Sequence, residues 1–242
     1  MIEGMGLGRR PPTDNQHQTR YPLRAMLPDT VATAERTLAL STRWRGIYDQ
    51  GAFPHCVGYS LSQMMSILNR RTFDAAWLYH QAQAVDDWPG TDYAGTSVRA
   101  GCDILREVGH VQVRNHKPMA PDFGHGISAN RWARTVGELR TCIASGVPVV
   151  VGTNWHRMMS MPNVRSPSGV PEYWMDPDNL GPLIGGHAYL LNRVSDRRQA
   201  FKTPNSWGID WPERGAGGAW IPYRLMERLL NEDGEAVAIT DR

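Results

Sequence analysis

Apolar residues recur at helical spacing through the first half of the chain. The i, i+3, i+4, i+7 positions of one helical face are filled by Leu61, Met64, Met65 and Leu68. We therefore expect a helix that begins near Cys56. Further helices are predicted over 73–83 and 96–109, the second capped by Thr96 or Ser97.

From about residue 135 the pattern changes to short apolar runs of the kind that form strands. A short helix is predicted over 135–146, and the β-branched run 147–153 is typical of a strand buried on both faces. Another helix is predicted over 224–233. The remaining strand candidates are 187–194, 199–208, 217–223 and 235–241. Helices followed by strands favour an α+β fold with two lobes and a cleft between them.

Two segments stand apart from this pattern. The first 20 residues form a polar, Pro-containing arm, which must pack on something if it is ordered, such as a neighbouring subunit. The stretch 156–184 is rich in Pro, Met, Asn and Asp and has no periodicity, as expected of a long functional loop. We divide the chain into an arm over 1–42, a helical lobe over 43–134 and a β-rich lobe over 135–242, which together form one domain.

Charge and composition exclude several kinds of partner. The formal net charge is +2, from 26 basic and 24 acidic residues, so neither nucleic acid nor a charged membrane is indicated. All but two of the basic residues are arginine, which points to a GC-rich genome and thus to a bacterium or its phage. The N-terminus lacks the apolar core of a signal peptide, and no stretch is long and apolar enough to span a membrane. We therefore expect a cytoplasmic protein.

The three cysteines are odd in number and far apart, so a disulfide framework and a zinc site are both disfavoured. Cys102 and Cys142 lie on apolar helical faces and are assigned to the core. Neither the histidines nor the cysteines have ligand spacing, and we expect no metal and no cofactor.

Three short segments carry the chemistry: DQGAFPHC, GGHAYLL and PNSWG. Nucleophilic cysteine catalysis requires a thiolate, an imidazole that holds its proton and a group that orients the imidazole. Cys56, His187 and Asn205 supply these types in that order. The helix N-terminus at Cys56 would favour the thiolate.

These segments, at separations of about 130 and 150 residues, resemble those of the papain-like cysteine peptidases over roughly 43–240. The resemblance implies a papain-like two-lobed fold, with a helical lobe, a β-barrel-like second lobe and the active site between them. It implies that Cys56 attacks the peptide carbonyl as an ion pair with His187, that Asn205 orients the imidazole and that Gln50 donates to the oxyanion.

The same resemblance extends to substrate binding. Trp207 in NSWG would shield the Asn205–His187 hydrogen bond, while Gly95 and Gly186 would line the substrate's path. Phe53 replaces a disulfide cysteine, and Val57 replaces a cleft tryptophan. No propeptide of the usual length fits before Cys56, so any restraint on activity must come from the arm or the 156–184 stretch.

We therefore expect a cysteine endopeptidase, a hydrolase whose substrate is polypeptide. A second hypothesis is a papain-fold structural or binding component of a larger assembly, such as a phage virion, with the arm and the 156–184 stretch as protein contacts. A third is a hydrolase of cell-wall peptides. The NSWG block counts against the usual Cys/His amidase fold, although it leaves cell-wall peptide open as a substrate.

Overall fold

The computed structural model describes residues 5–14, 16–25, 27, 33–38, 47–166, 169–213 and 216–242. The helices are α1 (Gln16–Arg20), α2 (Cys56–Asn69), α3 (Ala75–Val85), α4 (Val98–Glu107), α5 (Val136–Ala144) and α6 (Tyr223–Asn231). The strands are β1 (Glu35–Thr37), β2 (His110–Arg114), β3 (Lys117–Asp122), β4 (Ile127–Ala133), β5 (Val149–His156), β6 (Asn163–Arg165), β7 (Glu172–Trp174), β8 (Leu183–Leu191), β9 (Arg193–Ser195), β10 (Ala200–Thr203), β11 (Ala219–Pro222) and β12 (Glu235–Asp241). Short 3₁₀ turns are η1 (Leu23–Ala25), η3 (Phe123–His125) and η4 (Arg157–Ser160).

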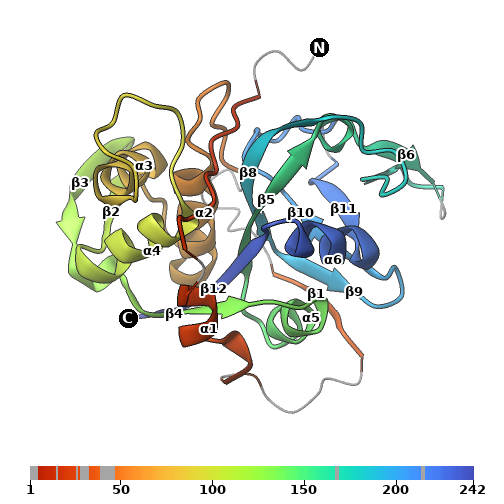
Figure 1. Ribbon diagram of the computed structural model, residues 1–242, viewed down its shortest axis with the longest axis horizontal. Helices are drawn as coiled ribbons and strands as arrows, with labels where there is room; N and C mark the ends of the chain where they lie inside the picture. Colours follow the sequence, from red (N-terminus) through yellow and green to blue (C-terminus); the bar gives the residue numbers. More distant parts are fainter. Residues whose placement is uncertain are drawn as a thin grey trace.

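Helices α2, α3 and α4 lie together on one side of the molecule, at the left of Figure 1. Their starts follow from local chemistry: Asp74 caps α3 by accepting from the Trp77 N–H, and Ser97 caps α4 by accepting from the Ala100 N–H. On the predicted apolar face of α2, Leu61, Met64 and Met65 are fully buried and Leu68 is partly buried. The three helices expected from the periodicity are thus confirmed.

A four-stranded sheet in the order β4-β12-β5-β8 backs α2. Its side chains alternate between two cores, as the period of a strand requires. Val150 and Val237 face the cluster under α2 and α4, whereas Val149, Val151 and Ala236 belong to the cluster that includes residues of α5 and α6. Burial on both faces explains the continuous apolar run of β5.

A six-stranded sheet, β1-β9-β10-β11-β7-β6, forms the far side of the molecule, and β2 pairs with β3 alone. The α+β class is confirmed, but the sheets of the described residues are open and form no closed barrel. Strand β4 lies within 43–134, the range assigned to the helical lobe, yet it pairs with β12. Long-range pairing of this kind leaves little local trace in a sequence.

The 156–184 stretch is more ordered than its composition indicated. It contains η4, β6 and β7, and its residues Met159, Trp174 and Met175 are buried in the core. Of the stretch and the arm, residues 1–4, 15, 26, 28–32, 39–42 and 167–168 lie outside the described residues.

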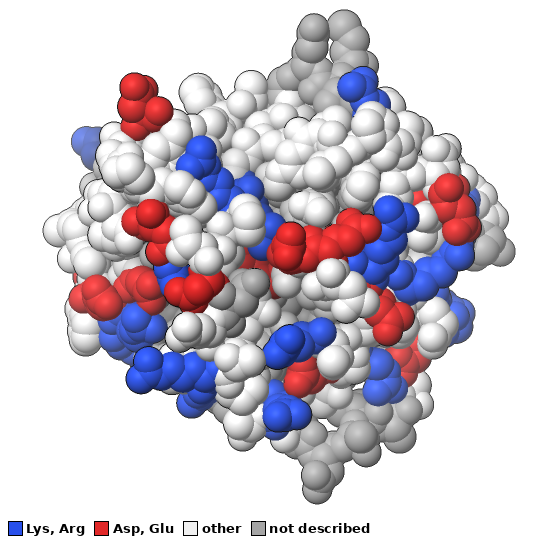
Figure 2. Space-filling view, in the orientation of Figure 1, with Lys and Arg blue, Asp and Glu red and all other residues white. Residues whose placement is uncertain are grey.

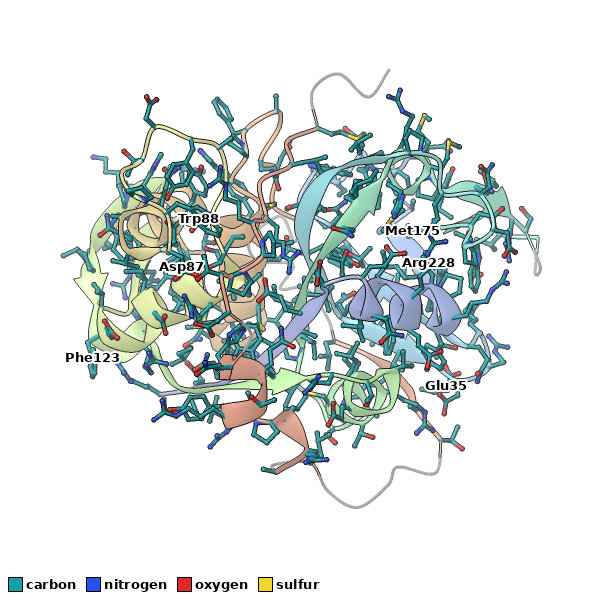
Figure 3. All side chains as sticks on the ribbon, in the orientation of Figure 1. Glu35, Asp87, Trp88, Phe123, Met175 and Arg228 are labelled. Carbon is teal, nitrogen blue, oxygen red and sulfur yellow. The ribbon has the colours of Figure 1, made fainter. Side chains whose placement is uncertain are left out.

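The N-terminal arm runs between the helices and the sheets. Figure 1 shows it in red, passing down the middle of the molecule to α1. Its Thr13 hydroxyl donates to Asp87 at 2.9 Å, and the Arg10 guanidinium lies over the Trp88 ring at 4.9 Å. Figure 3 labels Asp87 and Trp88 on the helical side of this segment. The described arm therefore packs on its own chain.

Charged side chains of both signs are intermingled on the face drawn in Figure 2. This agrees with the balanced composition. No helix of the described residues is long and apolar enough to cross a membrane.

Candidate active site

Cys56 is the first residue of α2, and its side chain is completely buried. The main-chain N–H of Ala188, in β8, donates to Cys56 Sγ at 3.4 Å. This contact places the thiol against the strand that carries His187, the residue before Ala188. The fold therefore brings together two residues that are far apart in the sequence.

His187 and Asn205 form a hydrogen bond whose direction can be assigned. His187 Nε2 lies 2.8 Å from Asn205 Oδ1, and the same oxygen accepts from the Ser206 N–H at 2.8 Å. Because a backbone N–H can only donate, this oxygen is the acceptor in both bonds and Nε2 carries the proton. The lone pair of the neutral ring is therefore on Nδ1, which makes no hydrogen bond with the described residues. Nδ1 is free to accept a proton.

Two tryptophans enclose the imidazole. The Trp207 ring stacks on the His187 ring at a centroid distance of 4.6 Å, and Trp155 meets it edge-on at 4.6 Å. Both indoles are buried, so the His187–Asn205 pair is shielded from water. Trp207 was expected in this position, whereas the role of Trp155 was not foreseen.

Burial favours the uncharged form of both reacting groups. It raises the pKa of the Cys56 thiol to about 11, although the N–H groups of Ala188, Gly8 and Val57 favour the thiolate. It lowers the pKa of His187 to about 4, against the opposing effect of Asn205. In this closed arrangement burial therefore opposes the expected ion pair between Cys56 and His187.

Gln50 is held with its amide nitrogen directed at peptide carbonyls. Its Oε1 accepts from the Ser206 hydroxyl at 2.6 Å, which fixes the orientation of the amide. Its Nε2 donates to the Gly6 carbonyl at 3.1 Å and to the Phe53 carbonyl at 2.7 Å. The residue expected to hold an oxyanion thus binds a carbonyl oxygen of the arm.

The arm is bound by main-chain hydrogen bonds on both sides. On the helical side, the Thr96 N–H donates to the Gly8 carbonyl at 2.9 Å and the Arg10 N–H donates to the Thr96 carbonyl at 2.9 Å. On the sheet side, the Gly186 carbonyl accepts from the N–H groups of Gly8 at 3.1 Å and Arg9 at 3.0 Å. An extended polypeptide therefore lies across the catalytic groups.

Glycines on the arm allow this close approach. A Cβ atom at Gly6 would lie 1.8 Å from the Phe53 carbonyl oxygen, and one at Gly8 would lie 2.0 Å from the Pro54 carbonyl oxygen. Such separations are far inside van der Waals contact, so a residue with a side chain cannot occupy either position without movement of the arm.

Glycines on the walls act in the same way. A Cβ at Gly95 would lie 2.3 Å from the Gly8 carbonyl oxygen, and one at Gly186 would lie 2.2 Å from the Arg9 carbonyl oxygen. Gly95 and Gly186 were both expected along a substrate path, and both border the arm. On the helical wall the hydrogen bonds come from Thr96, the neighbour of Gly95, which was not foreseen.

Comparisons with known proteins agree on the architecture. A cysteine protease from Xylella fastidiosa, xylellain, matches 98% of this chain and 96% of its own with a TM-score of 0.65 and 19% identity. Procathepsin B S9 from Trypanosoma congolense matches 98% of this chain over 87% of its own length, with a TM-score of 0.58 and 14% identity. Procathepsin L 3 from Tenebrio molitor matches 97% of this chain over 75% of its own length, with a TM-score of 0.58 and 11% identity.

The chain has the papain-like fold. No protein-family model matches it, and no curated protein sequence is similar to it. The identities are low enough that the structures establish the fold alone.

Ser206 is a residue of the site that the sequence motifs had not singled out. Ser206 orients both Gln50 and Asn205, and its place directly after Asn205 in NSWG was the available signal.

Cys102 and Cys142 are buried in the core, as predicted. No group of three or more potential metal ligands occurs among the described residues. A hollow of about 560 Å³ is lined by residues of α1, α4 and β4, and its lining includes neither Cys56 nor His187.

Proposed function

We propose that this protein is a cysteine-type peptidase that hydrolyses polypeptide through Cys56, His187 and Asn205, with Gln50 as an oxyanion donor. The observation that carries the proposal is the bound main chain. An extended segment of polypeptide lies across Cys56, and the Gln50 amide nitrogen donates to one of its carbonyl oxygens at 3.1 Å. The site is thus shaped for peptide groups.

The reaction follows from the assigned tautomer. With the arm displaced by a substrate, Nδ1 of His187 takes the thiol proton and the Cys56 sulfur attacks the scissile carbonyl carbon. The Gln50 amide and the Cys56 N–H stabilise the oxyanion that forms. His187 then gives its proton to the leaving amine, and a water molecule hydrolyses the thioester to release the second product and the free thiol.

Asn205 acts by fixing the ring. Its Oδ1 accepts from Nε2 and from the Ser206 N–H, so the imidazole keeps Nδ1 available as the base. The same oxygen stabilises the imidazolium that forms during attack. Trp207 and Trp155 exclude water from this hydrogen bond, which strengthens it.

The resting protein is latent in this proposal. The arm fills the cleft, and a buried thiol with a pKa of about 11 supplies few thiolates at neutral pH. Two of the similar structures, procathepsin B S9 and procathepsin L 3, are proforms by name. Activity is therefore expected only when the arm leaves the cleft.

The test compares four full-length chains on denatured casein and on a random peptide mixture. These are the wild type, the arm variant Gly6→Ala/Gly8→Ala, the same arm variant with Cys56→Ala, and the control Gly137→Ala. Gly137 lies in α5, where a Cβ would have only one neighbour within 4 Å, at 3.8 Å. We expect cleavage by the arm variant and none after Cys56→Ala.

Absence of cleavage by the folded arm variant would contradict the proposal. It would favour a structural or binding component, for which the buried thiol is the supporting observation. Parallel incubation with peptidoglycan separates a protein substrate from a cell-wall peptide. A fixed copy number of the chain in purified phage particles, measured by quantitative mass spectrometry, would identify it as a virion component.

A further inference from the structure

Arg9 of the arm enters a closed pocket next to the catalytic groups. Its side chain is 2% exposed, and its Nε donates to Glu235 Oε1 at 3.1 Å. Its Nη2 donates to the Asp233 carbonyl oxygen at 2.7 Å. The arm therefore places a guanidinium against a carboxylate whose own side chain is fully buried.

The sheet register makes room for this side chain. Glu235, the first residue of β12, pairs with Gly152 of β5, and Gly152 pairs on its other side with Ala188 of β8. A Cβ at Gly152 would lie 3.0 Å from Arg9 Nε and 3.1 Å from Glu235 Oε1. The missing side chain at Gly152 thus leaves the space that the guanidinium fills.

The carboxylate is not fully used by the arm. Glu235 Oε2 is buried and accepts no hydrogen bond from the described residues, while His17 Nε2 lies 3.7 Å from it. A buried carboxylate is retained at a cost unless it is paired. An occupant whose guanidinium binds both oxygens would satisfy this group better than Arg9 does.

The pocket belongs to the same cleft as the candidate nucleophile. Arg9 donates its main-chain N–H to the Gly186 carbonyl, next to His187 in β8, and Ala188 donates to the Cys56 sulfur. A substrate that uses these main-chain groups would present one of its side chains to Glu235.

We propose that the pocket closed by Glu235 is a specificity pocket that takes an arginine side chain of the polypeptide substrate, and that Arg9 fills it in the resting protein. The inference rests on the proposed peptidase function. It also explains why the arm carries an arginine at this point. The ion pair between Arg9 and Glu235 holds the arm in the cleft until a substrate arginine takes the place of Arg9.

The first experiment measures kcat/KM for peptides that are identical except at one position. The enzyme is the full chain with Gly6→Ala, Gly8→Ala and Arg9→Ala, so that its own arginine does not compete. Each residue of a peptide is replaced in turn by arginine, citrulline or leucine. Citrulline keeps the shape of arginine without its charge. We expect one position at which kcat/KM for the arginine peptide exceeds that for the citrulline peptide by at least about tenfold, because citrulline cannot form the buried ion pair with Glu235.

Two substitutions test the pocket itself. Glu235→Gln should remove most of the preference for arginine over citrulline, read as the ratio of the two kcat/KM values. Gly152→Ala should reduce cleavage of the arginine peptide, because the new methyl group on the opposite wall fills the space of the guanidinium while the carboxylate stays in place. The proposal therefore remains testable if Glu235→Gln does not fold. The control is Glu227→Gln on the exposed surface of α6.

Binding separates this inference from the function on which it rests. The chain with Gly6→Ala, Gly8→Ala, Arg9→Ala and Cys56→Ala is titrated into fluorescently labelled arginine and citrulline peptides, and the fluorescence anisotropy is recorded. Tighter binding of the arginine peptide without any cleavage by the Cys56 enzyme would support the pocket and contradict the peptidase. Cleavage with equal rates for arginine, citrulline and leucine at every position would overturn the pocket and leave the peptidase standing.

Discussion

Release of the arm should activate the Cys56 thiol by an amount that the structure allows to be calculated. In Gly6→Ala/Gly8→Ala, the new methyl groups would stand 1.8 and 2.0 Å from carbonyl oxygens, so the arm cannot keep its position. Water then reaches the sulfur, and the cause of its raised pKa is removed.

The magnitude comes from the thiolate fraction. With a pKa of about 11, roughly one Cys56 in a thousand is ionised at pH 8, whereas at an ordinary thiol pKa near 9 about one in ten is. The rate of alkylation at pH 8 should therefore rise by about 100-fold, and further if solvent access is limiting in the wild type.

The assay is iodoacetamide labelling followed by mass spectrometry of each cysteine peptide, from about pH 6 to pH 11. Cys102 and Cys142 are internal controls, because both are buried in the core and burial raises the pKa of both thiols. Gly137→Ala controls for the substitution itself. An unchanged Cys56 rate in the arm variant, or equal labelling of all three cysteines through general unfolding, would refute the reasoning.

Three further outcomes are expected. In the arm-released background, Gln50→Ala should lower kcat by about 100-fold or more through loss of an oxyanion donor, and a smaller loss than tenfold by steady-state kinetics would argue against that role. The buried His187 has its pKa lowered to about 4, so the stability it contributes is present above about pH 6.5 and is lost as the pH falls through 4. We expect up to about 3 kcal/mol less free energy of unfolding in urea at acid pH, and a flat profile would contradict it. Asp196 accepts from Arg140 Nε at 2.7 Å and from Tyr223 Oη at 2.9 Å, so Asp196→Asn should cost about 2 kcal/mol in urea unfolding, and a loss below about 0.5 kcal/mol would show that this network is not needed.

The short motifs of this chain indicate the chemistry because they encode local structure. The apolar periodicity after Cys56 places that residue at a helix start, and NSWG keeps Asn205, Ser206 and Trp207 in consecutive positions that require no long-range information. Strands β5 and β12 were recognisable because burial on one or both faces dictates their apolar residues.

Other features had only weak signals in the sequence. Gly6 and Gly8 mark a segment that approaches another backbone closely, but they do not say which backbone. Glu235 opens an apolar strand, which is an unusual place for a carboxylate, but its partner Arg9 is over 200 residues away. The β4–β12 pairing and the open sheets likewise depend on contacts that no local pattern specifies.

The sequence by itself determined the residue types of the candidate site, the helix that presents Cys56 and the α+β class, because periodicity and motif spacing are local properties. Only the tertiary structure decided that the arm occupies the cleft, that burial favours the neutral forms of both reacting groups and that Arg9 meets Glu235. Those results depend on burial and on which distant segments come into contact, because desolvation in a closed cleft opposes the charged forms of the thiol and the imidazole.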